Sequence, residues 1–143
     1  MPTLSRWFVR TALVYFVAAL ITGVALMLRP VLNLPPEVAA LQPVYFHLLM
    51  VGWVSQLIFG HAPIILPGVM NVATNYSPAF YAHLALLHTS LILRVTGDLA
   101  FADPFNPVRR WGGMLNVIAL LVFLANTVRS ARRAPQGSLT TAH

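Results

Sequence analysis

The chain contains no cysteine and no lysine, and only three of its 143 residues are acidic. Without thiols it cannot form disulfides, attach haem covalently through a Cys-X-X-Cys-His motif, or hold a thiolate-ligated zinc ion or iron–sulfur cluster. Charged residues make up 8% of the chain, against about 25% in soluble domains. So few polar side chains cannot cover the surface of a soluble domain, and the sequence predicts a membrane protein.

Hydrophobic residues make up 58% of the chain, and its net charge is +6. All nine cations are arginines. They lie at the ends of apolar runs, where positive residues set membrane topology, and do not form a patch beside aromatic residues. We therefore expect the lipid bilayer as a partner and no nucleic acid.

Four apolar segments are each near the length of about 20 residues that crosses the hydrocarbon core. They cover about residues 11–28, 44–66, 79–97 and 113–128, and the third should end with Gly97 as its C-terminal cap. Short connections predict an all-α fold, an integral membrane up-down four-helix bundle. We expect one four-span domain over residues 1–133 and a disordered tail over residues 134–143.

The first span is expected to remain in the protein. It follows Arg6 and Arg10 as a signal peptide would, but it exceeds the apolar region of about 7–15 residues found in signal peptides. Arginines also follow the last span, and all three acids lie in the connections at the opposite surface. Positive residues favour the cytoplasm, so we predict a multi-pass protein with both termini cytoplasmic, although Arg29, Arg109 and Arg110 lie on the other side.

Four histidines lie in or at the ends of the second and third spans: His47, His61, His83 and His88. An ionisable side chain is unfavourable at membrane depth and usually marks a site. Neutral imidazole also suits haem iron and other transition metals. The histidines are therefore candidate metal and cofactor ligands. The alternative is that each only hydrogen-bonds a neighbouring helix.

The short connection between the second and third spans predicts that they are antiparallel neighbours. If residues 66 and 79 lie at equal depth, His61 lies almost opposite His83, and His47 lies opposite residue 98. These depths favour His61 and His83 as a ligand pair. His47 would be a second axial ligand, paired with His88 or with a histidine of another subunit.

On an α-helix, the fourteen positions between His47 and His61 amount to a rotation within about 40° of a whole number of turns. Both histidines should then lie on one face, as in a helix that serves two stacked cofactors. Arg94 is the other candidate. It could form a salt bridge with Asp98 one turn later, or bind an anionic group such as a haem propionate.

The stretch from His47 to Gly60, HLLMVGWVSQLIFG, resembles the histidine-bearing spans of haem–copper oxidase catalytic subunits and of the NnrS family. Leu93-Arg94-Val95 is similar to an element in later NnrS spans, and residues 59–67, FGHAPIILP, are similar to a segment of small bacterial membrane proteins. The resemblance covers the second and third spans. It implies His47 as a haem ligand, Arg94 as a propionate partner, and the bacterial inner membrane as the location.

Both families have many more spans than this chain, and the oxidases have more histidines. We therefore expect a reduced relative that binds b-type haem, alone or as a homodimer, for electron transfer or for sensing or handling of nitric oxide or oxygen. The alternatives are a copper-binding protein with methionines as soft ligands, a cofactor-free accessory or assembly subunit of a respiratory complex, and a transporter. No nucleophile or acid–base pair supports catalytic activity by the chain alone.

Overall fold

The computed structural model describes residues 3–70, 78–100 and 106–132. Every regular element in these ranges is helical, so the all-α prediction is confirmed. The elements in chain order are α1 (Thr3–Leu28), the 3₁₀ turn η1 (Pro36–Ala40), α2 (Leu41–Phe46), the π-helical segment η2 (His47–Ser55), α3 (Gln56–Met70), α4 (Pro78–Ala100) and α5 (Pro107–Arg132). Because α2, η2 and α3 follow one another without a break, the chain forms four helical rods.

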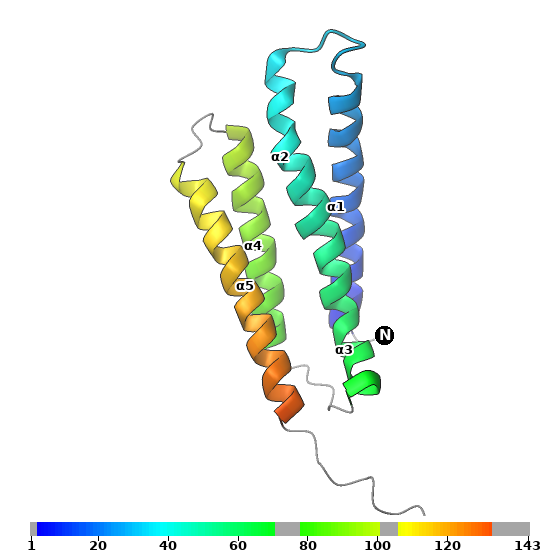
Figure 1. The fold of residues 1–143 in the computed structure, drawn as a ribbon, viewed down its shortest axis with the longest axis vertical. Helices are drawn as coiled ribbons and strands as arrows, with labels where there is room; N and C mark the ends of the chain where they lie inside the picture. The colour runs from blue at the N-terminus through cyan, green and yellow to red at the C-terminus, as the bar shows by residue number, and fades with distance from the viewer. Residues whose placement is uncertain (1–2, 71–77, 101–105, 133–143) are drawn as a thin grey trace, which may run out of the picture.

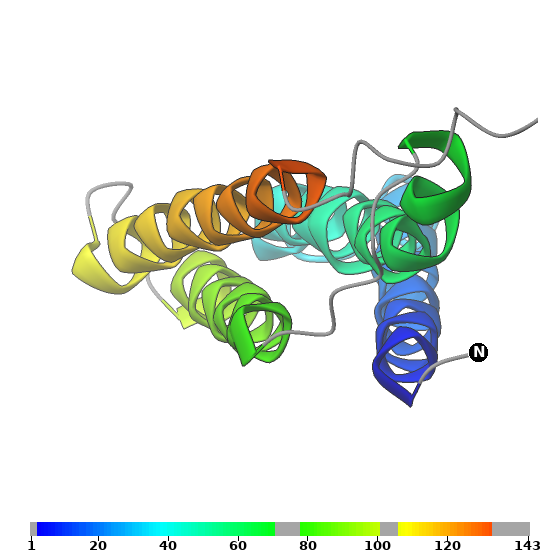
Figure 2. The same cartoon turned by 90° about the horizontal axis from the view of Figure 1, so that it is seen from below.

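The four rods form two helical hairpins. In the first, α1 packs along α2, η2 and α3; in the second, α4 packs along α5. Figures 1 and 2 show the α4–α5 pair beside the first hairpin, which it contacts through α4 against α2 and η2. Successive rods run in opposite directions, so the beginning of α1 and the end of α5 lie at the same end of the structure (Figure 1).

Three rods are long and apolar enough to cross a membrane: α1, residues 36–66 and residues 107–130. The exception is α4, which carries two histidines, an arginine and an aspartate. Three of its polar side chains are nevertheless buried, those of His83, Ser90 and Asp98, whereas its apolar residues Ile92 and Leu99 are exposed. These polar groups of α4 thus face the protein interior together with Phe80, Leu87 and Leu91, while its outward face carries apolar residues.

The helices extend beyond the predicted spans, and α1 begins at Thr3 rather than near residue 11. Gly97 is not a C-terminal cap, because α4 continues to Ala100. It instead lets α5 approach closely, since a Cβ there would lie 2.9 Å from the Arg109 Cα. Gly112 has the same role on α5, where a Cβ would lie 2.8 Å from the Arg94 backbone nitrogen. The predicted tail, residues 134–143, lies outside the described residues.

Two glycines allow close packing in the first hairpin. A Cβ on Gly52 would lie 2.7 Å from the Tyr15 Cβ, and a Cβ on Gly60 would lie 2.7 Å from the Phe8 Cβ. Both distances are far inside van der Waals contact. The backbone of the α2–η2–α3 rod is therefore held against the side chains of α1, and this contact fixes which residues of the rod face α4.

Candidate functional site

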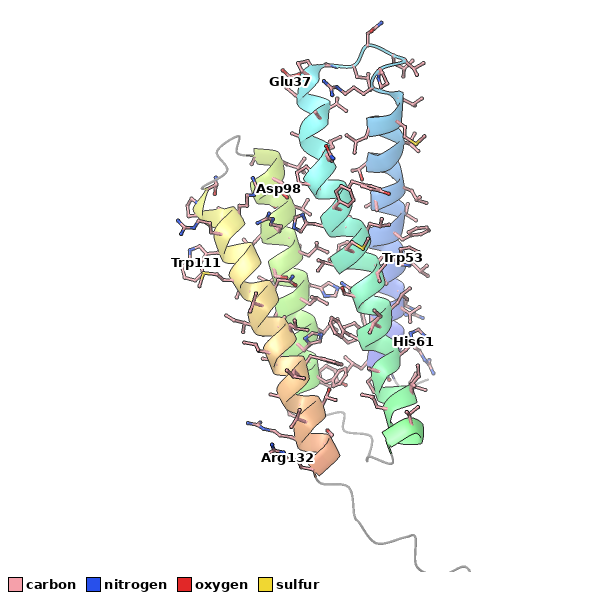
Figure 3. The ribbon with its side chains drawn as sticks, in the orientation of Figure 1. Glu37, Trp53, His61, Asp98, Trp111 and Arg132 are labelled. Atoms are coloured by element: carbon pink, nitrogen blue, oxygen red, sulfur yellow. The ribbon has the colours of Figure 1, made fainter. Side chains whose placement is uncertain are left out.

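A cluster of charged side chains joins three rods around Asp98, near the end of α4 that Figure 3 shows toward Glu37. The Asp98 side chain is fully buried. Its Oδ1 lies 3.0 Å from Arg109 Nε, and its Oδ2 lies 3.6 Å from Arg94 Nε and 3.5 Å from His47 Nδ1. The side chains of these three partners are 25–29% exposed. We call these four residues the Asp98 cluster.

The Asp98 cluster confirms two expectations. The antiparallel register that placed His47 opposite residue 98 is correct, and the salt bridge from Arg94 to Asp98 is present. Arg109, predicted from the sequence only as a topology signal, is a third partner of Asp98. A buried carboxylate is stable only when it is paired, so the depth of Asp98 was the signal that could have indicated a further cation on α5.

The described residues of the cluster carry more positive than negative charge. Two guanidinium groups share one carboxylate, and Arg94 uses Nη1 to donate a hydrogen bond of 3.4 Å to the Arg109 carbonyl. Arg94 Nε and both Asp98 oxygens are buried, and the described residues offer them no well-directed hydrogen bond. The pairing is therefore electrostatic, and among the described residues it leaves one cationic charge uncompensated.

A small cavity adjoins the cluster between the two hairpins. Its volume is about 50 Å³, compared with a share of about 30 Å³ for one water molecule in the liquid. It has room for a single small ion or molecule and excludes a porphyrin. The lining residues come from η2, α4 and α5: His47, Val51, Ser90, Leu91, Arg94, Gly112, Gly113 and Asn116.

All four histidines in the spans use Nδ1 in the same way. Each Nδ1 donates to a backbone carbonyl: His47 to Pro43 at 2.7 Å, His61 to Leu57 at 2.8 Å, His83 to Ala119 at 2.7 Å and His88 to Leu84 at 2.9 Å. A carbonyl only accepts, so in each neutral ring the proton is on Nδ1 and the lone pair is on Nε2. Histidines that bind metals have this arrangement, but it also satisfies an isolated histidine.

His83 is enclosed by aromatic rings. Its side chain is fully buried, and its ring centroid lies 4.6 Å from that of Phe59, 5.3 Å from that of Phe123 and 6.0 Å from that of Phe8. Its Nε2 has no hydrogen-bond partner among the described residues. The bond from Nδ1 ties α4 to α5, and the phenyl rings leave no described cavity beside Nε2 for a cofactor.

His61 lies on the opposite side of α3 from His83. Phe59 contacts the His83 ring, and two residues along an α-helix rotate the side chain by about 200°. Accordingly, Figure 3 places His61 on the side of α3 away from α4 and α5. It lines an open apolar groove of about 410 Å³ formed by α3 alone, with Leu57, Ile58, Ala62, Ile65 and Leu66. The structure thus does not bring the predicted pair together.

Because of the π-helical segment, the side chains of His47 and His61 point to different sides of the rod. Residues bonded i→i+5 rotate by roughly 80° each instead of 100°, so the nine residues of η2 remove about half a turn. His47 therefore faces α4 whereas His61 faces outward, and the expectation of a shared face is wrong. The remaining histidine, His88, is half-buried, and its ring centroid lies 5.6 Å from that of Tyr15 on α1.

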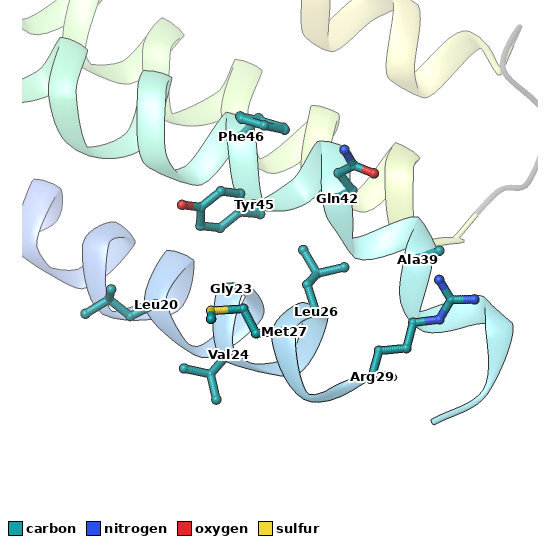
Figure 4. Close-up of a pocket in the computed structure, with 10 residues that line it drawn as sticks. All are labelled: Leu20, Gly23, Val24, Leu26, Met27, Arg29, Ala39, Gln42, Tyr45 and Phe46. Carbon is teal, nitrogen blue, oxygen red and sulfur yellow. The ribbon is translucent and has the colours of Figure 1, made fainter. Parts of the chain in front are cut away.

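A larger groove lies at the Glu37 end between α1 and the η1–α2 segment (Figure 4). Its volume is about 560 Å³, which would accommodate a cofactor-sized ligand. Its lining is mainly apolar, with Arg29 and Gln42 as polar groups, and contains no histidine. It is therefore a poor site for a haem that requires an imidazole ligand.

These observations define the class: an all-helical protein of four antiparallel rods, three of which are long and apolar enough to cross a membrane. The chain belongs to the family described as a domain of unknown function, DUF8744, whose model matches residues 2–132. Comparisons with curated proteins and with solved structures found no match. Within the described ranges, no three histidine or acidic side chains gather as a metal site.

Proposed function

We propose that this chain is a four-span membrane protein that carries a b-type haem against the outward face of α3, with His61 as one axial ligand. The observation that supports this assignment is the position of His61. Its Nδ1 donates to Leu57, its Nε2 keeps the lone pair, and the ring lines an open apolar groove of about 410 Å³. By contrast, the His83 ring is enclosed by phenyl rings, and His47 lines the small cavity of about 50 Å³.

The fourth span is α4. It contains 23 residues, which corresponds to about 34 Å of helix at 1.5 Å per residue and exceeds a hydrocarbon core of about 30 Å. Its polar side chains are turned into the bundle, as described above. The described arginines at the termini, Arg6, Arg10, Arg129 and Arg132, support cytoplasmic termini, by the positive-inside rule. The resemblance to bacterial proteins supports the inner membrane.

A second axial ligand, where the haem has one, would come from another chain, because none of the other described histidines lines the α3 groove. His83 is closed off by phenyl rings, and His47 faces Asp98 rather than the α3 groove. A second copy that presents its own His61 would complete a six-coordinate haem, and a partner subunit would serve equally. Bis-histidine haem carries single electrons, whereas haem with one histidine leaves a position for nitric oxide or oxygen.

The absorption spectrum of the detergent-purified chain tests this proposal. We expect a Soret band that sharpens on dithionite reduction, with a haem content of one per two chains for the homodimer. His61→Ala should abolish the band. His83→Phe is the matched control, because it replaces an imidazole of the same bundle and should leave the haem content unchanged. A colourless wild type, or a His61→Ala variant with full haem content, refutes the proposal.

A second candidate is the cofactor-free accessory subunit, favoured by the surroundings of two histidines. His47 belongs to an ion-pair cluster, and His83 ties α4 to α5 inside an aromatic enclosure. Both residues are explained without a cofactor. A colourless, metal-free protein that co-purifies with a respiratory complex would support this candidate. Copper is less well supported, because no three histidine or acidic side chains of the described chain gather as a metal site.

A further inference from the structure

We propose that the cavity beside Arg94 is a binding site for a small monovalent inorganic anion, such as chloride or nitrite. Three features of one location support this proposal: two arginines beside one carboxylate, a partly enclosed space of suitable size, and hydrogen-bond donors without partners among the described residues. It does not depend on haem, because the cavity lies between η2, α4 and α5, away from the α3 groove.

The charge argument concerns Arg94, which lines the cavity, whereas Asp98 does not. Among the described residues, the carboxylate of Asp98 is shared between Arg94 and Arg109. Placing two cations beside one anion in a medium of low polarity is unfavourable. A monovalent anion in the cavity would restore neutrality.

The donors are the Arg94 guanidinium and the Asn116 side-chain amide. Guanidinium has five N–H groups, and only Nη1 of Arg94 donates a hydrogen bond to a described residue. Asn116 makes no side-chain hydrogen bond within the described chain. Ser90 is not a donor here, because its hydroxyl donates to the Leu87 carbonyl at 2.8 Å. An anion would thus be held from α4 and α5 together.

The size of the cavity sets the class of ligand. A volume of about 50 Å³ admits one ion of one to three heavy atoms. A phospholipid headgroup or a larger organic acid would not fit. Arg94 is 25% exposed and lies in the penultimate turn of α4, so an ion could reach the site from the membrane surface.

The test uses the full chain in detergent, exchanged into sodium gluconate, whose anion is too large for the cavity. Sodium chloride or sodium nitrite then replaces gluconate at constant ionic strength while the thermal unfolding midpoint is measured. An anion that binds only the folded protein raises the midpoint in a saturable way. We expect a saturable rise of the midpoint with chloride or nitrite, and for sulfate only the non-saturating rise of a general salt effect. An equal response to all four salts would show a general ionic effect and overturn the proposal.

Gly113→Ala provides the sharpest variant. The added Cβ would lie 3.9 Å from Arg94 Nη1, an ordinary contact, so the fold should be preserved while the methyl group occupies part of the cavity. In gluconate we expect the midpoint to change as it does for Gly68→Ala, since both variants add a helix-favouring methyl group, and we expect at least a tenfold weaker apparent affinity of Gly113→Ala for the anion. Gly68→Ala is the matched control, since no atom of the described residues outside its own stretch of α3 lies within 4 Å of its added Cβ. A Gly113→Ala protein that responds like wild type would exclude this cavity as the site.

The measurement also separates this inference from the haem proposal, because haem content is read from the absorbance of the same samples. A colourless protein with a saturable anion response supports the anion site and refutes the haem proposal. A haem-loaded protein without a saturable anion response supports the haem proposal and rules out the anion site. If neither chloride nor nitrite raises the midpoint, the cavity holds water and the inference is wrong.

Discussion

Oδ1 of Asp98 lies 3.0 Å from Nε of Arg109, and this ion pair joins the end of α4 to the beginning of α5. The other carboxylate oxygen faces Arg94 and His47. One buried acid thus connects the second hairpin internally and also connects it to the first hairpin.

Asp98→Asn should destabilise the protein strongly, because it leaves two guanidinium groups next to each other without their shared carboxylate. Breaking a buried pair from one side costs roughly 3–5 kcal/mol, and partial exposure of both arginines reduces this to about 2–4 kcal/mol. Unfolding in mixed detergent micelles measures the change. Glu37→Gln is the control, since it removes an exposed acid at the same end. Equal stability of the two variants would contradict the role of Asp98.

Small anions should rescue part of the Asp98→Asn defect. The variant has one more uncompensated positive charge than the wild type, so chloride or nitrite should bind more tightly. We expect a larger rise of the unfolding midpoint than in wild type when gluconate is replaced by chloride. A smaller rise would indicate that the anion does not interact with these guanidinium groups.

Gly52→Ala should weaken the contact between α1 and η2. The added Cβ would lie 2.7 Å from the Tyr15 Cβ and 3.0 Å from the Leu91 Cδ2. The Tyr15 Cβ is fixed to the backbone and cannot move aside, so the helices must separate at a cost of about 1–3 kcal/mol. Thermal unfolding beside Gly68→Ala, which adds the same methyl group in open space, measures this cost. Identical midpoints for the two variants would rule out the close approach.

Thr11→Val and Gln56→Leu should differ although they remove the same hydrogen bond. Thr11 Oγ1 lies 2.7 Å from Gln56 Oε1, and the Gln56 side chain is fully buried. Thr11→Val leaves a buried amide without a partner and should cost about 1–3 kcal/mol, whereas Gln56→Leu removes the amide itself and should change stability by less. Unfolding of both single variants and the double variant tests the asymmetry. A Gln56→Leu variant that is less stable than the Thr11→Val variant would contradict this prediction.

The sequence was sufficient for the helical fold, the order of the rods and the placement of His47 opposite Asp98. These follow from apolar length and from the short connection between the second and third rods. The pairing of His61 with His83 could not be judged in the same way, because equal depth says nothing about direction. Phe59 lies against His83, and His61 is rotated away from it.

The π-helical segment explains the remaining failure. The predicted shared face of His47 and His61 depends on the α-helical rotation of about 100° per residue. The sequence of residues 47–55 does not indicate that this segment forms i→i+5 hydrogen bonds. Gly97 was misinterpreted for a related reason. A glycine near a helix end is typical of a cap, but the same residue also permits close helix contact, and the closeness of Arg109 is a tertiary property.

The division into two hairpins has a mechanical consequence. The seam between them is polar at one end, where His47 faces Asp98, and aromatic toward the other, where Phe8 and Phe59 surround His83. Phenyl packing weakens steeply when the rings separate, because dispersion contacts are short-ranged, whereas the attraction between His47 and the Asp98 carboxylate at 3.5 Å falls off slowly with distance. If one hairpin tilts against the other, the two should therefore stay in contact at the aromatic end and separate first at the end that contains Asp98.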